Sequence, residues 1–344
     1  MTLRTAYLAG IAALIGGLSS QPVAAQQSVE AFYKGKQIDF IIGYTPGGGY
    51  DTYARLVARH IGQFIPGNPS IVARNMPGGG SRVAAGYMFR IAPKDGTVLA
   101  TADQSLALQQ AVGDKTIQFD TTKFNYIGNP SAENNTTVVW ATSGIASIED
   151  ATKKDVPMGA TGGSTSSQYP KVMNALLGTK FKIILGYPGG NDINLAMEKG
   201  EVAGRGSNSW ASWKATRPDW LTNKKINILV QIGLTKAHDL PDVPLLIDLA
   251  KNDSDRAVLR LLSAPATIGR PIFTTPDVPA ERVKALREAF EKTMKDPAFL
   301  EDAGKAKLDL DPVSGEELQK IVTEIMATPK ETADRLSSII GELQ

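Results

Sequence analysis

The chain has 344 residues, of which 42% are hydrophobic and 21% are charged, with 37 Lys and Arg against 35 Asp and Glu. This composition is typical of a soluble globular protein long enough for two domains, and its near-neutral charge does not favour nucleic acid or an acidic membrane surface as a partner. The chain contains no cysteine, which excludes disulfides, thiol chemistry, cysteine metal sites and a lipid-bearing cysteine.

The N-terminus has the pattern of a secretory signal peptide. Arg4 is the only charged residue among the first 25, and the apolar segment AYLAGIAALIGGL follows it. Small residues at Val23 and Ala25 then form a cleavage site. The apolar segment is too short to span a bilayer well, although a short N-terminal anchor is the alternative. We therefore expect residues 1–25 to be a signal peptide and the remaining chain to be soluble in the periplasm.

Strand and helix patterns alternate through the next two hundred or so residues. The predicted strands are 38–44, 70–74, 97–101, 138–141, 158–160, 183–186, 202–206 and 226–232. The predicted helices between them are 52–64, 82–91, 166–177 and 191–199. In the first of these, one apolar stripe is formed by Tyr53, Leu56, Val57, Ile61 and Phe64. This alternation predicts an α/β protein in which helices cover both faces of parallel sheets.

The C-terminal third reads as mostly helical. Pro279 stands near the start of one amphipathic helix, and Ser314 with Glu317 forms a capping box at the start of another. The chain has no long Gly/Ser linker, so two lobes would be joined by short crossing segments. The candidates for these segments lie near 126–140 and 263–273.

Four joints combine a strand end, two or three glycines and a helix start. They lie at Gly47–Gly49, Gly78–Gly80, Gly162–Gly163 and Gly189–Gly190. The first N–H groups of a helix lack partners within the helix, and glycine lets an anion approach them without a clash from Cβ. A single joint of this kind would be explained by tight packing, but four in one chain favour a ligand that meets the backbone.

The chemistry of the joints favours a carboxylate over a phosphate. Neither the G-x-x-x-x-G-K-[ST] motif nor the G-x-G-x-x-G motif is present. The third joint carries hydroxyls instead, at Thr161 and along 164–167. Hydroxyls and backbone amides suit a carboxylate that is held by hydrogen bonds rather than by a strong cation.

Catalytic candidates are few. His60 and His238 are the only histidines, and neither stands in a catalytic or metal-binding motif. Ser164 lacks the last glycine of a nucleophile elbow. Asp51 reads as a helix cap that also ties the first glycine loop, or alternatively as a proton acceptor. Arg205 lies on a short glycine-flanked strand, where it would pair with a ligand carboxylate or with a local Asp.

Seven segments along the chain carry a family resemblance: YTPGGGYDTYARLVARHI, NMPGGGSRVAAGYMF, APKDGTVLAT, GATGGSTSSQYPKVMNALLG, ILGYPGGNDINLAMEKGEVAGRG, LPDVPLL and RPIFTTPDVPAERVKALREAF. In this order they resemble the substrate-binding proteins of tripartite tricarboxylate transporters, the Bug family. The resemblance implies a type II periplasmic binding-protein fold, with two α/β lobes and a hinged central cleft. We divide the chain into lobe 1 (26–127 plus 264–344) and lobe 2 (128–263).

The resemblance also implies a site. In that family, the loop after the first strand and a Ser/Thr-rich loop of the second lobe grip a ligand carboxylate, partly through water. These loops correspond to 45–51 and 161–167. Gln168 stands where a histidine or similar polar residue is usual, and Ser207 with Asn208 stands where many members have an Asp-Asn pair. The expected ligand-binding residues are Thr45, Gly47, Gly48, Gly49, Tyr50, Asp51, Gly79, Ser81, Gln104, Thr161, Gly163, Ser164, Thr165, Ser166, Gly189, Arg205, Ser207 and Asn208.

The implied function is that of a monomeric binding protein without a cofactor and without enzyme activity. It would capture a small organic carboxylate and deliver it to the membrane permease subunits of a transporter. Dicarboxylates, tricarboxylates, amino acids and aromatic acids all fit such a site. Two alternatives are a sensor subunit that presents its ligand to a membrane kinase, and a periplasmic hydrolase that uses Ser164 or Asp51.

Overall fold

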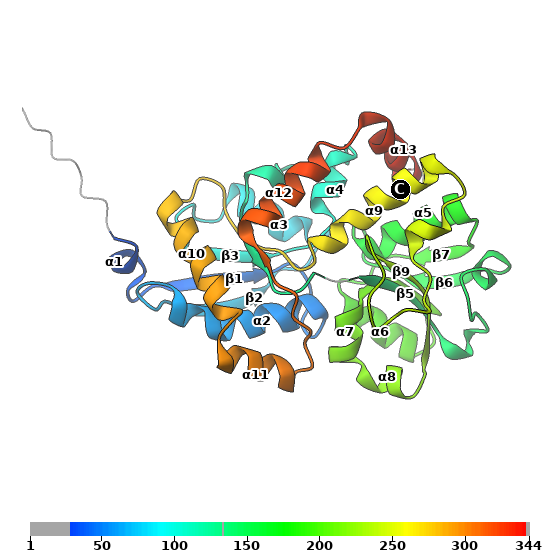
Figure 1. The fold of residues 1–344 in the computed structure, drawn as a ribbon, viewed down its shortest axis with the longest axis horizontal. Helices are drawn as coiled ribbons and strands as arrows, with labels where there is room; N and C mark the ends of the chain where they lie inside the picture. Colours follow the sequence, from blue (N-terminus) through cyan, green and yellow to red (C-terminus); the bar gives the residue numbers. More distant parts are fainter. Residues whose placement is uncertain (1–27, 133, 342–344) are drawn as a thin grey trace, which may run out of the picture.

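The computed structural model describes residues 28–132 and 134–341, which form two α/β lobes side by side (Figure 1). We call the six-stranded sheet with its helices the first lobe, and the five-stranded sheet with its helices the second lobe. The predicted signal peptide lies outside the described residues. Within the described ranges, no helix has both the length and the apolar character needed to cross a membrane.

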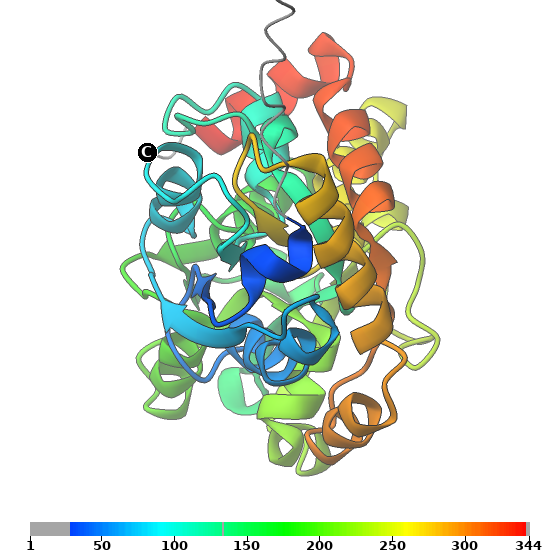
Figure 2. The same cartoon turned by 90° about the vertical axis from the view of Figure 1, so that its left-hand side faces the viewer.

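The first lobe has the strand order β11-β4-β10-β3-β1-β2. Its strands are β1 (Gln37–Ile42), β2 (Ser70–Asn75), β3 (Val98–Thr101), β4 (Asn125–Asn129), β10 (Ile272–Thr274) and β11 (Val313–Ser314). Its helices are α1 (Val29–Tyr33), α2 (Gly49–Ile61), α3 (Arg82–Arg90), α4 (Leu106–Ala111), α10 (Ala280–Thr293), α11 (Pro297–Lys305) and α12 (Gly315–Met326). Figure 2 looks onto this lobe and shows α1 in blue next to α10 in gold.

Local sequence explains how these helices begin and pack. The stripe predicted for α2 is buried, with Tyr53, Leu56 and Val57 against the sheet. The predicted capping serine is present at α12, where the backbone N–H of Glu317 donates to Ser314 Oγ at 3.2 Å. Helix starts and apolar faces are therefore set by short segments of the chain.

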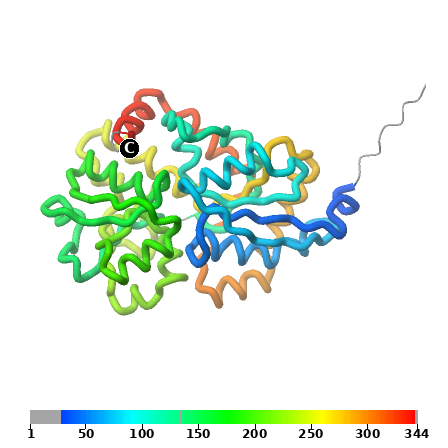
Figure 3. Tube along the Cα trace, turned by 180° about the vertical axis from the view of Figure 1, so that it is seen from behind, coloured from blue at the N-terminus to red at the C-terminus, as the bar shows by residue number. Residues whose placement is uncertain are grey.

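The second lobe has the strand order β7-β6-β8-β5-β9. Its strands are β5 (Asn135–Trp140), β6 (Val156–Gly159), β7 (Phe181–Ile184), β8 (Gly204–Ser209) and β9 (Ile226–Ile232). Its helices are α5 (Thr165–Leu177), α6 (Gly190–Glu198), α7 (Trp210–Thr216), α8 (Pro218–Thr222) and α9 (Asp253–Ser263). The C-terminal helix α13 (Lys330–Gly341) also packs here, on α5 and α9 (Figures 1 and 3).

The prediction of parallel sheets is wrong, because both sheets are mixed. Strand β10 is antiparallel to β3 and β4, and β5 is antiparallel to β8 and β9. These two strands are the ones through which the chain arrives from the other lobe, so they enter each sheet from the opposite end. The short strands β4, β10 and β11 were not predicted; β4 and β10 lie at or beside the predicted crossing segments.

The crossings decide where the carboxyl ends of the strands point. The chain leaves the first sheet after β4 and leaves the second after β9, so the end of each of these strands faces the other lobe. Strands β1 to β3 run parallel to β4, and β6 to β8 run parallel to β9. Both sheets therefore direct the loops that follow their strands toward the space between the lobes, where ligands bind in open α/β sheets. The lobe boundaries at 127/128 and 263/264 stay a prediction.

Candidate functional site

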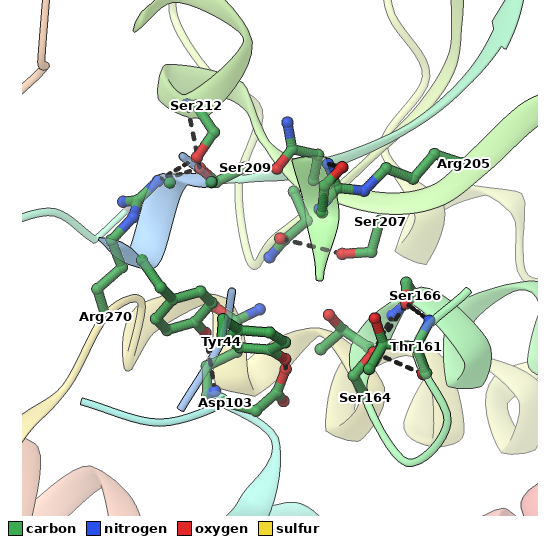
Figure 4. Close-up of a pocket in the computed structure, with 18 of the residues that line it drawn as sticks. Tyr44, Asp103, Thr161, Ser164, Ser166, Arg205, Ser207, Ser209, Ser212 and Arg270 are labelled. Carbon is green, nitrogen blue, oxygen red and sulfur yellow. Dashed lines mark hydrogen bonds between the residues drawn. The ribbon is translucent and has the colours of Figure 1, made fainter. Parts of the chain in front are cut away.

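A cavity of about 60 Å³ lies between the two lobes (Figure 4). The first lobe lines it with Tyr44, Gly48, Gly49, Tyr50, Asp103, Gln104, Gly269 and Arg270. The second lobe lines it with Asn135, Thr161, Ser164, Thr165, Ser166, Gly190, Arg205, Ser207, Asn208, Ser209 and Ser212. Its walls thus come from loops after β1, β3 and β6, from the segment before β10, from β5 and β8, and from the starts of α2, α5, α6 and α7.

Two helices begin at the cavity without a side-chain cap. The N-cap of α2 is Gly48 and that of α6 is Gly189, and neither helix start receives a hydrogen bond from a capping side chain. Gly48 leaves open space around it, since an added Cβ would meet only the backbone nitrogen of Asn191, at 3.9 Å. The uncapped N–H groups and the positive end of the helix dipole make these starts suitable for an anion.

The serine-rich loop before α5 is bonded mostly to itself. Ser164 Oγ donates to the backbone oxygen of Thr161 at 2.9 Å and accepts from the N–H of Ser166 at 3.2 Å. The N–H of Thr161 donates to Ser166 Oγ at 3.0 Å. Among the described residues, the hydroxyl of Thr165 has no such partner, although Thr165 lines the cavity. The hydroxyl of Thr161, which also lines the cavity, likewise has no partner among the described residues, so Thr161 and Thr165 carry the hydroxyls of this loop that are available to a ligand.

Several glycines bring the two lobes together instead of lining the cavity. Gly80 has φ +60°, and an added Cβ would overlap the backbone of Gly163 in the other lobe. Hydrogen bonds cross the same gap: Gln109 Nε2 donates to the oxygen of Gly163 at 3.0 Å, and Thr45 Oγ1 donates to Asp192 Oδ2 at 2.8 Å. The second and third glycine joints thus form a contact between lobes.

Asp51 ties the first glycine loop to the sheet. Its Oδ2 accepts from the N–H of Gly47 at 3.0 Å, and its Oδ1 accepts from Arg55 Nε and Asn75 Nδ2, each at 2.8 Å. The loop tie was predicted, but the cap was not placed correctly, because the N-cap of α2 is Gly48. The carboxylate is thus occupied by three protein donors and does not line the cavity, which does not favour a role as proton acceptor.

A buried carboxyl group lies at the first-lobe wall of the cavity. Asp103 accepts from the hydroxyl of Tyr44 and from the N–H of Ser105, the latter at 2.9 Å. Burial raises the pKa of Asp103 above its usual range, and the pKa of Tyr44 is also raised, mainly by burial. Next to it, the Tyr50 hydroxyl accepts from the N–H of Gln104 at 3.0 Å and donates to the oxygen of Gly269 at 3.2 Å. These bonds fix the tyrosine rings.

Two arginines line the cavity on opposite sides in the view of Figure 4. Arg270 is buried, donates to Ser209 Oγ and Ser212 Oγ, and lies 4.0 Å from the centre of the Tyr53 ring. Arg205 donates from Nη1 to the oxygen of Gly190 and to Asn194 Oδ1, at 3.3 and 3.2 Å. Arg205 forms no ion pair with any Asp or Glu in the part of the chain that the structure describes, which removes the alternative of a local Asp partner.

Comparison with known proteins places the chain in a family. The family model described as the tripartite tricarboxylate transporter family receptor matches residues 54–343. The chain belongs to this receptor family. A search of the curated proteins found no match. The resemblance seen in the sequence is thereby confirmed.

Solved structures show the fold of these receptors. The periplasmic binding protein BugD has 16% identity and a TM-score of 0.71, over 89% of this chain and 98% of its own. The R. palustris protein Rpa4515 with adipate has 18% identity and a TM-score of 0.68, over 88% and 97%. MatC from Rhodopseudomonas palustris with bound malate has 16% identity and a TM-score of 0.69, over 87% and 99%. The predicted fold class is confirmed by this likeness.

The structure brings together most of the site residues predicted for a receptor of this family. Those that line the cavity are Gly48, Gly49, Tyr50, Gln104, Thr161, Ser164, Thr165, Ser166, Arg205, Ser207 and Asn208. Those that are not among the lining residues are Thr45, Gly47, Asp51, Gly79, Ser81, Gly163 and Gly189. Binding of a ligand by any of them stays a prediction. Gln168, at the position where the family pattern departs, is buried in α5 and also does not line the cavity.

Sequence reasoning missed seven lining residues: Tyr44, Asp103, Asn135, Ser209, Ser212, Gly269 and Arg270. An eighth, Gly190, belongs to the fourth predicted joint but was not among the expected ligand-binding residues. The position of Asp103 could have been predicted, because it follows a predicted strand. Ser209 could also have been predicted, because Arg205, Ser207 and Ser209 alternate along one strand and so share a face. Arg270 gave no comparable signal, since its position depends on the crossing segment before β10. The candidate nucleophile Ser164 has no histidine beside it, because His60 bonds Asp302 and His238 lines another cavity.

Proposed function

We propose that this receptor captures a small organic carboxylate in the periplasm and delivers it to the membrane permease subunits of its transporter. The observation that carries the proposal is the meeting of two uncapped helix starts, α2 and α6, with the Thr165 hydroxyl at one cavity between the lobes. Backbone N–H groups and a hydroxyl are donors that can hold a carboxylate by hydrogen bonds, and the cavity is small.

The two lobes would hinge at the crossing segments and close on the ligand. Gln109 with Gly163, and Thr45 with Asp192, would be contacts of the closed form. A ligand that touches both lobes prefers the closed form and shifts the population toward it. Permease subunits that recognise this form would receive only loaded receptor. The carboxylates bound by MatC and Rpa4515 support this class of ligand.

The test combines identification of the ligand with a check on turnover. Native mass spectrometry of freshly purified protein, followed by thermal unfolding with a panel of organic acids, should find a carboxylate that raises the unfolding midpoint with concentration. Solution scattering should show a smaller radius of gyration with that acid, and the acid should be recovered unchanged. Conversion of the acid in proportion to protein would favour a hydrolase, and a panel without any effect would refute carboxylate capture.

A further inference from the structure

We propose that Asp103 takes up a proton when an anionic ligand enters the cavity, so that capture of the ligand is coupled to the binding of a proton. The inference rests on the proposed function, because it needs an anion in the cavity. It concerns the first-lobe wall, where Asp103 and Tyr44 lie together (Figure 4). The proton comes from the solvent, and no covalent bond of the ligand changes.

Asp103 is a buried carboxyl group whose hydrogen-bond partners are all neutral. The residue is 3% exposed. In the described part of the chain, its Oδ2 accepts from the Tyr44 hydroxyl, and its Oδ1 accepts from the N–H and the hydroxyl of Ser105. Burial opposes ionisation more than these bonds favour it, so the pKa of Asp103 lies above its usual range. The charged form of Asp103 is therefore disfavoured before any ligand arrives.

The cations around Asp103 are engaged elsewhere. Arg82 of α3 favours the charged form of Asp103, but it forms its ion pair with Asp114. Arg270 donates to two serine hydroxyls of the second lobe. Arg205 of β8 lies away from Asp103 in Figure 4, and neither histidine is among the residues that line this cavity. None of these groups forms an ion pair with Asp103 within the described ranges.

The other titratable groups near Asp103 are tyrosines that stay neutral. Tyr44 and Tyr50 come from the first lobe, and Tyr169 comes from α5 of the second lobe. Burial raises the pKa of all three hydroxyls far above their ordinary value, and the nearby Asp103 raises them further. Asp103 is thus the group of this wall that titrates when the charge in the cavity changes.

The ligand would bring its charge close to Asp103, because the cavity is small. Asp103 shares a cavity of about 60 Å³ with Gly48 and Thr165, which belong to the two loops proposed to hold the carboxylate. Two carboxylates in one buried site disfavour each other's charge, and one of them takes a proton. Asp103 is the one that takes it, because the ligand carboxylate meets the uncapped N–H groups of α2, whereas Asp103 is held by neutral donors only.

Protonation would also make Tyr44 a donor to the ligand. Oδ2 of Asp103 accepts from the Tyr44 hydroxyl and from no other donor among the described residues. A proton on Oδ2 would donate to the Tyr44 oxygen, and the Tyr44 hydroxyl, which lines the cavity, would then turn its own proton to the ligand carboxylate. The first-lobe wall would change from an anion into a neutral hydrogen-bond donor.

The experiment is calorimetry between about pH 6.5 and 9 with succinate, citrate, glutamate and benzoate, of which the tightest binder is the probe. Where Asp103 is ionised before binding and neutral after it, buffers of different ionisation enthalpy should show an uptake of nearly one proton per ligand. Affinity should fall there by up to about tenfold per pH unit, because the proton is harder to obtain as the pH rises.

Two variants test whether Asp103 is the group that takes the proton. Asp103→Asn is neutral at every pH, and its Nδ2 would donate to Tyr44 as the protonated acid does. Its affinity should vary less than about threefold over this range, and at the high end it should bind more tightly than wild type. Asp51→Asn removes another buried carboxylate, which is paired with Arg55 outside the cavity lining, and should keep the wild-type pH dependence.

The outcomes separate this inference from the proposed function. If the affinity of wild type falls with pH no more than that of Asp103→Asn, Asp103 takes up no proton, and the inference is wrong while carboxylate capture stands. If none of the four acids binds, the proposed function itself fails. Should Asp103→Asn not fold, Tyr44→Phe removes a hydrogen bond that favours the carboxylate, so the fall in affinity should begin at a higher pH. An unchanged pH profile in that variant would overturn the inference.

Discussion

The two three-glycine runs of the chain have the same letters and different surroundings. In 46–49 the letters PGGG lead into α2, which begins at Gly49, and both Gly48 and Gly49 line the cavity. In 77–80 the same letters precede α3, where Gly80 meets the backbone of Gly163 and none of the three glycines lines the cavity. Whether a glycine lines the cavity or makes a contact between the lobes therefore depends on the segment that faces it. In both runs that segment belongs to the other lobe.

The largest expected effect is on the first run. Gly48 has extended backbone angles that valine adopts readily, and an added Cβ would meet no atom closer than 3.9 Å. Gly48→Val should therefore fold normally, with a free energy of unfolding within about 0.5 kcal/mol of wild type. Its branched side chain would fill the place of the anion, and calorimetry should show a loss of affinity of about 100-fold or more. Affinity close to wild type would show that the start of α2 is not part of the site.

The next largest loss of affinity is expected in the loop 161–167, which Gly80 contacts through Gly163. Thr165→Ala removes a cavity-lining hydroxyl that has no described partner, and affinity should fall about tenfold, as for a hydrogen bond to a charged group. The matched variant Ser164→Ala removes a helix cap, so it should lower the free energy of unfolding by about 1 kcal/mol. Its loss of affinity should be smaller than that of Thr165→Ala. Calorimetry measures the affinity of each variant, and denaturant unfolding measures its stability. The reverse order of affinities would contradict the view that Ser164 is occupied within its own loop.

A smaller effect on affinity is expected from the second run. Gly80→Ala puts a Cβ against the backbone of Gly163, a clash that should cost about 1–2 kcal/mol in the closed arrangement alone, whereas the strain of its left-handed backbone is common to the open and closed forms. The closed form would then be less populated, and part of the binding free energy would be used to close the lobes. Affinity should therefore fall about fivefold, although no ligand contact is lost. Scattering should show a larger radius of gyration before ligand is added. An unchanged radius and affinity would mean that this contact does not influence closure.

Local features of the fold were predictable from the sequence, whereas long-range ones were not. The apolar stripe of α2, the cap at Ser314 and the strand Ile226–Ile232 each depend on neighbours along the chain, and the structure has them. The antiparallel strands β5 and β10 were missed because their direction depends on how the chain crosses between lobes. Alternation of strands and helices cannot report such a crossing.

The same division applies to the site. The loops around Gly48 and Ser164 were found because glycine and hydroxyl residues at helix starts have a local meaning. Arg270 and Asn135 were missed because each is brought to the cavity by a crossing segment. Which hydroxyls remain available, those of Thr161 and Thr165 and not that of Ser164, depends on hydrogen bonds that only the folded loop defines.

The smallest effect on affinity is expected at Asp51, which supports the first glycine run from behind. Asp51→Asn keeps one oxygen acceptor but replaces the other with a donor, so either the N–H of Gly47 or the pair of Arg55 and Asn75 loses its partner. This should lower the free energy of unfolding by about 1–3 kcal/mol, because the group is buried. Affinity should change less than about threefold, since the cavity-lining amides of Gly48 and Gly49 remain in the loop. Denaturant unfolding and calorimetry on one preparation give both quantities. A large loss of affinity at unchanged stability would show that Asp51 contributes to ligand binding. The binding loop would then include Gly47, which Asp51 holds, as well as Gly48 and Gly49.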